Sequence, residues 1–179
     1  MRFLFNLRVL EYKKLWLLQQ PFSYCTYKDL GGINLDEINQ AIKKGEFVKA
    51  KQLSKTMDLE ALTEKLFLIA YDDETIAPYG FANYLLFDKE TSELHYLASF
   101  LLSMGLNHLD GAYQTSFFHA KRAVELAPED ISYKEYLLLF FELPEPLLSK
   151  DEASKIAKEI LKVDPENKAA LSVLNGDIH

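Results

Sequence analysis

The chain has 179 residues, of which 49% are hydrophobic and 26% charged, so it can bury a core the size of one domain or two small ones. Its formal net charge of −7 and pI near 5.1 disfavour nucleic acid and anionic lipid as partners, because both need a basic surface. Seven Gly and six Pro are few for an all-β protein, so the composition favours helices.

The N-terminal segment, residues 1–33, predicts an amphipathic helix followed by a connecting loop. It begins like a secretory signal, but Asn6 and Arg8 interrupt the apolar run and no cleavage site follows, so we expect a cytoplasmic protein without a membrane span. A strand over residues 3–9 is the less favoured alternative. The single cysteine, Cys25, fits a reducing compartment, and its role stays open.

The next segment predicts a helical hairpin. Asn34 followed by Glu37 has the spacing of a capping box, which indicates the start of a helix that ends at Gly45. Apolar residues then recur three or four apart from Phe47 to Met57, which indicates a second helix with one apolar face.

Three further helices are expected in the middle of the chain, over residues 59–70, 78–87 and 91–105. The second begins with Pro78, which suits the first turn of a helix because proline has no backbone N–H to leave unpaired there. The third carries leucines and an alanine at helical spacing and ends at Gly105.

The second half predicts four helices, which begin after Gly111, at Tyr133, after Ser149 and at Pro165. Ser132 with Glu135 and Ser149 with Glu152 both have capping-box spacing. The last helix is expected to cover the open end of a stack of helices.

Two stretches near the C-terminal end, residues 123–130 and 160–167, are similar to each other. Their prolines, Pro128 and Pro165, lie 37 residues apart, close to the period of roughly 34 residues of stacked helical hairpins. With their small residues at expected helix crossings, these features resemble the tetratricopeptide repeat (TPR) family. The residues that carry the resemblance are Gly45, Phe47, Ala50, Ala120, Ala123, Pro128, Ala153, Ala157 and Pro165.

The resemblance implies an all-α fold in which antiparallel hairpins over residues 34–179 stack as a short right-handed α-solenoid, in one compact domain with the N-terminal segment. It also implies that those small residues and prolines form the seams between hairpins, where small side chains let backbones approach closely. A protein of this family is a scaffold for binding other proteins, so we expect no catalytic activity.

The middle of the chain is unusually aromatic, and acidic residues lie beside this region. The candidate partner-binding residues are Tyr71, Asp72, Asp73, Tyr79, Tyr84 and Tyr113. Tyrosine offers a large rigid contact with one polar tip, and carboxylates favour a partner with Lys or Arg. We therefore expect a protein or peptide ligand, with a basic one favoured, in an acidic and aromatic groove. A solvated acidic loop is the alternative at Asp72 and Asp73.

Two other functions stay open. Small size and acidity also suit an immunity or antitoxin-like protein that neutralises a basic toxin. A helical enzyme would instead assemble its site from His95, His119 and nearby carboxylates. The four histidines, which include His108 and His179, show no metal-ligand spacing, and there is no Gly-rich phosphate loop, so no metal or cofactor is expected. The oligomeric state stays open.

Overall fold

The computed structural model describes residues 35–176. The expected N-terminal helix and loop, Cys25, the capping residue Asn34 and His179 lie outside the described residues. The chain divides into two compact units, Met1–Asp58 and Leu59–His179.

The described part of the first unit is a pair of helices, α2 (Leu35–Lys43) and α3 (Phe47–Leu53), that pack on each other. Gly45 lies in the turn between them with φ of +72°, a left-handed conformation that glycine adopts without steric cost. Ala50 is completely buried. The predicted helical hairpin is therefore present in this unit.

The second unit contains seven α-helices among its described residues. They are α4 (Leu59–Asp72), α5 (Ala77–Asp88), α6 (Ser92–Phe100), α7 (Ala112–Leu126), α8 (Ile131–Leu138), α9 (Lys150–Leu161) and α10 (Lys168–Asn175). A π-helical turn, η1 (Leu101–Gly105), continues α6, and a 3-10 turn, η2 (Leu139–Phe141), continues α8. Across the described residues there are helices and no strands, which confirms the all-α prediction for that part of the chain.

Local sequence sets most of these helix starts. Thr91 accepts a hydrogen bond from the backbone N–H of Leu94 and begins α6, and the predicted capping box of Ser149 and Glu152 begins α9. Pro78 lies in the first turn of α5, as expected.

Two predicted helix starts are wrong. Asp130, and not Ser132, caps α8. Its carboxylate accepts a hydrogen bond from the backbone N–H of Ser132, which lies two residues further along the chain. The last helix begins at Lys168 and not at Pro165, because Asn167 accepts the backbone N–H of Ala170 and sets the start there.

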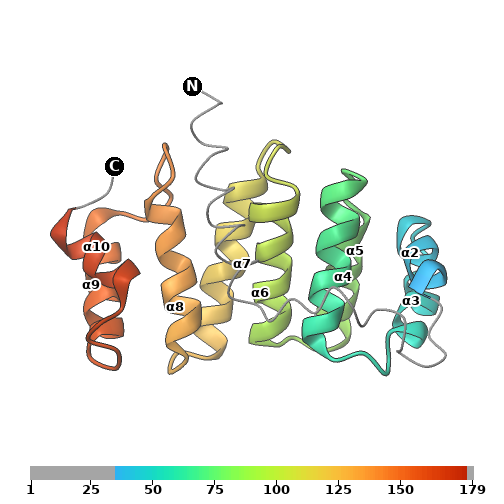
Figure 1. Ribbon diagram of the computed structural model, residues 1–179, viewed down its shortest axis with the longest axis horizontal. Helices are drawn as coiled ribbons and strands as arrows, with labels where there is room; N and C mark the ends of the chain where they lie inside the picture. The colour runs from blue at the N-terminus through green and yellow to red at the C-terminus, as the bar shows by residue number, and fades with distance from the viewer. Residues whose placement is uncertain (1–34, 177–179) are drawn as a thin grey trace. The chain divides into compact units, whose positions relative to one another are not determined.

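Successive helices of the second unit pack against each other from α4 to α10, side by side in chain order (Figure 1). The predicted seam alanines Ala120, Ala123, Ala153 and Ala157 are each at most 1% exposed, whereas Pro128 and Pro165 lie exposed in the turns that follow α7 and α9. None of the described helices is both long and apolar enough to span a membrane.

Candidate functional site

The most concentrated polar chemistry of the described residues lies along the seam between α6 and α7. Ser99 and Ser116 meet there, and each hydroxyl lies 2.8 Å from the backbone carbonyl oxygen of the other residue, to which it donates. One turn along the same seam, His95 of α6 meets His119 of α7. The two pairs run in opposite directions along the chain, so α6 and α7 are antiparallel.

The two histidines lie at the centre of a chain of hydrogen bonds. His95 Nδ1 lies 2.8 Å from His119 Nδ1, and the two rings are 6% and 4% exposed. At one end of the chain, the Tyr79 hydroxyl of α5 lies 3.1 Å from His119 Nε2. At the other end, His95 Nε2 lies 3.1 Å from Glu90 Oε1. All four ring nitrogens therefore have a protein partner.

Glu90 closes the chain at the surface because it comes just before the Thr91 cap of α6, from where its carboxylate reaches back to His95. Arg122 of α7 binds both of its oxygens, from Nε at 2.8 Å and from Nη2 at 3.1 Å. This two-point contact is the strong geometry for a guanidinium and a carboxylate. Hydrogen bonds from Arg122 and then from His95 lower the pKa of Glu90 to about 2, so its carboxylate is ionised.

Burial dominates the electrostatics of His119. Burial and, as a smaller contribution, the neighbouring His95 together lower the pKa of the imidazole from 6.5 to about 4. The physical cause is the loss of water around a charge that has no carboxylate of its own. His119 is therefore neutral at physiological pH.

A second polar network is buried beside the first. The Tyr136 hydroxyl of α8 lies 3.0 Å from Ser99 Oγ and 2.8 Å from Ser103 Oγ in η1. Burial raises the pKa of Tyr136, which therefore acts as a neutral donor and acceptor. Because the hydroxyls satisfy one another, this network fixes the register of α6, α7 and α8.

Aromatic contacts join helices that lie two apart in the chain. Phe67 of α4 packs on Phe100 of α6 with ring centroids 5.3 Å apart. Tyr96 of α6 lies 4.9 Å from Tyr136 and 5.8 Å from Tyr133, both of α8. Phe67, Phe100 and Tyr96 are therefore used in packing between helices, whereas Phe87 and Phe118 lie exposed.

The six predicted partner-binding residues do not lie on one surface. Tyr71 is 47% exposed at the end of α4, next to the exposed Asp72 and Asp73. Tyr79 points inward to His119, and Tyr84, five residues further along α5, is half-buried on Phe81. Tyr113, on α7, is half-buried, and burial raises the pKa of its hydroxyl to about 12. Only the first three form a contiguous exposed group.

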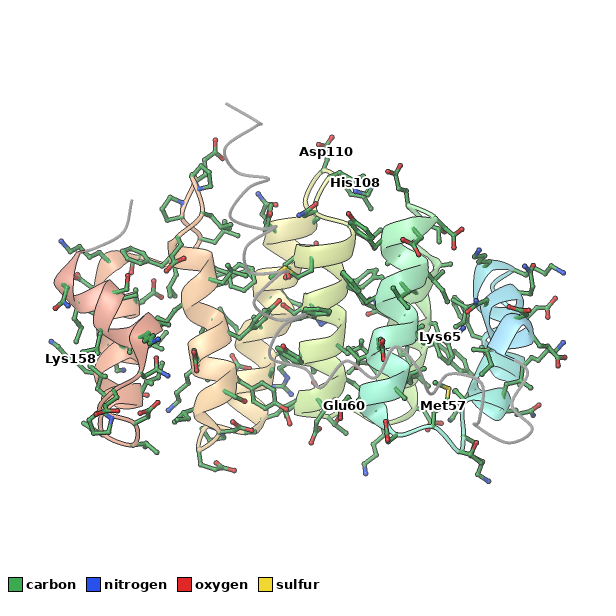
Figure 2. The ribbon with its side chains drawn as sticks, in the orientation of Figure 1. Met57, Glu60, Lys65, His108, Asp110 and Lys158 are labelled. Atoms are coloured by element: carbon green, nitrogen blue, oxygen red, sulfur yellow. The ribbon has the colours of Figure 1, made fainter. Side chains whose placement is uncertain are left out.

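The structure brings together His95 and His119, which the sequence suggested as alternative catalytic residues. It adds Tyr79, Glu90 and Arg122, whose place in this chain of hydrogen bonds the sequence did not reveal. His108 does not join them, because it lies exposed with Asp110 in the loop between η1 and α7, at the opposite end of the helices from Glu60 (Figure 2). Among the described residues, no group of three or more His, Cys, Asp or Glu side chains is placed to hold a metal ion.

Comparison with known proteins found no family model, no curated protein and no solved structure that matches this chain.

Proposed function

We propose that the protein is a TPR-like interaction module that binds a basic segment of another protein. The observation that carries the proposal is the contact between helices two apart in the chain: α4 packs on η1 at the end of α6, α6 meets α8 through aromatic rings, and α8 packs on α10. Such contacts are typical of stacked helical hairpins, in which each repeat leans on its neighbours. The buried seam alanines favour the same arrangement.

The charge of the second unit supports a basic partner. From Leu59 to Ala120 the sequence has nine acidic residues and two basic ones, and one of the basic residues, Lys65, is buried. Tyr71 adds an exposed ring beside Asp72 and Asp73 at the end of α4. A Lys or Arg side chain satisfies both features, because it pairs with carboxylates and stacks on the face of an aromatic ring. The same chemistry would suit an immunity protein that covers a basic toxin.

The enzyme alternative rests on the contact between His95 and His119. We do not propose it as the function, because both rings are more than nine-tenths buried and each ring nitrogen already has a partner in the protein. A general base must reach a substrate proton within hydrogen-bonding distance.

Selection of peptides from a random library against the full chain tests the proposal. We expect enrichment of Lys and Arg together with binding that weakens as salt rises. Two variants should each lose most of this binding. One is the double variant Asp72→Asn with Asp73→Asn, and the other is Tyr71→Ala. A control of equal charge, Glu129→Gln with Glu145→Gln, changes two exposed acids elsewhere in the unit and should retain it. Enrichment of neutral or acidic peptides, or equal loss in the control, would reject the proposal.

A further inference from the structure

The chain of hydrogen bonds runs from Tyr79 through His119 and His95 to Glu90, and the positions of its hydrogens follow from the charge of Glu90. The Glu90 carboxylate is ionised and can only accept, so His95 Nε2 must carry a hydrogen. In a neutral His95 the Nδ1 atom is then a bare acceptor, and His119 must donate to it from its own Nδ1. A neutral His119 leaves its Nε2 bare, so the Tyr79 hydroxyl donates. The neutral pair therefore has one consistent arrangement, in which each donor points toward Glu90.

One added proton reverses the far end of this chain. If His95 takes the proton, its Nδ1 donates to His119, whose own hydrogen must then be on Nε2. If His119 takes the proton, both of its nitrogens carry hydrogens. In either case the Tyr79 oxygen must accept. Two added protons would set two N–H groups against each other across 2.8 Å, so the folded pair holds at most one.

The charged groups around the pair lie at its His95 end. Glu90, in the connection between α5 and α6, contacts His95 and not His119. Arg122, on α7, binds Glu90 and also donates from Nη1 to Glu125, one turn further along that helix, at 3.0 Å. The group from α5 is the uncharged hydroxyl of Tyr79. The carboxylate therefore lies at the His95 end of the pair, and the uncharged hydroxyl lies at the His119 end.

We propose that the His95–His119 pair is a one-proton switch that turns the Tyr79 hydroxyl from a donor into an acceptor. The switch carries a change of pH from the buried seam of α6 and α7 to α5. Tyr79 is half-buried, so its released hydrogen becomes available to solvent or to a bound molecule. This inference is independent of the proposed partner.

Nitrogen NMR of the histidine rings in the full chain tests the switch. At about pH 8 we expect His119 to carry its hydrogen on Nδ1 and His95 to carry it on Nε2. On acidification, His119 Nε2 should gain a hydrogen with the same midpoint at which the pair takes up its proton, and the signals of the exposed His108 serve as an internal reference. A hydrogen on His119 Nε2 at about pH 8, or two fully protonated rings in the folded chain, would overturn the proposal. The first result does not depend on how stable the protein is in acid.

Two variants with a matched control test the mechanism. Glu90→Gln keeps an acceptor for His95 but removes the charge, so the midpoint of proton uptake should fall by about one pH unit or more. Glu93→Gln removes a carboxylate that bonds to Ser92 and should leave the midpoint nearly unchanged. Tyr79→Phe should abolish the pH-dependent shifts of the α5 amides that share this midpoint. Equal effects of Glu90→Gln and Glu93→Gln, or persistence of those α5 shifts in Tyr79→Phe, would contradict the switch.

Discussion

Acid should destabilise this protein through His119. The pKa of its imidazole is about 4 in the folded chain and 6.5 when exposed, so between these values the unfolded chain binds a proton that the folded chain rejects. The contribution of the neutral His119 to the free energy of unfolding is therefore fully present above about pH 6.5 and decreases as the pH falls toward 4. Each pH unit corresponds to about 1.4 kcal/mol, which gives about 2 kcal/mol lost at pH 5 and about 3 kcal/mol at pH 4.

Urea unfolding followed by circular dichroism, at about pH 7.5 and about pH 5, measures this loss. His119→Gln keeps a polar side chain without a titrating ring, so the variant should lose about 2 kcal/mol less than the wild type over this interval. His108→Gln, in the exposed loop before α7, should retain the dependence of the wild type. The difference between variants matters here, since other groups titrate in both. Equal losses in the wild type and His119→Gln would refute the assignment of the effect to this ring.

Three further predictions concern the packing of the second unit. Gly105→Ala should lower the free energy of unfolding by about 1 kcal/mol despite the better helix propensity of alanine, because the new Cβ would lie 3.1 Å from the buried Cβ of Ala70. A raised melting temperature would contradict this contact. Ser99→Ala and Ser116→Ala should each lower the free energy of unfolding by about 1–3 kcal/mol. The double variant should lose less than the sum, because the two hydroxyls also contact each other at 2.8 Å and each single variant already removes that shared contact; strict additivity in urea unfolding would argue against it. Ala123→Leu should overpack its seam and cost about 1–3 kcal/mol, and an unchanged denaturation midpoint would show room that the structure does not.

The helices were predictable because their signals are local. The capping box of Ser149 and Glu152 and the proline in the first turn of α5 each act within one turn, so the sequence alone locates them. The error at Ser132 has the same origin. Asp130 and Ser132 are both good capping residues, and the choice between them depends on how the turn after α7 closes.

The histidine pair was harder to predict, because its members are 24 residues apart and each looks like a packing residue by itself. One signal was nevertheless present. A hairpin folded between Asn107 and His108 sets Ser99 opposite Ser116 and His95 opposite Ala120, next to His119. The length of the loop obscured this register, because residues 107–111 do not form a standard tight turn. Pairing the two helices before judging each histidine would have placed both rings in one contact.

The acidic residues of the chain do not all have the same role in the structure. In the sequence, Glu90 counts equally with Asp72 and Asp73 among the acidic residues that suggest a basic partner. In the structure, both oxygens of Glu90 are bound by Arg122, and one of them also by His95, so its charge is already balanced within the protein. Asp72 and Asp73 also lie exposed, at the end of α4. A change at Glu90 should therefore alter the response to pH, whereas a change at Asp72 or Asp73 should alter the attraction of a cationic partner. Comparison of the two kinds of variant separates charges that act within the protein from charges that act on a partner.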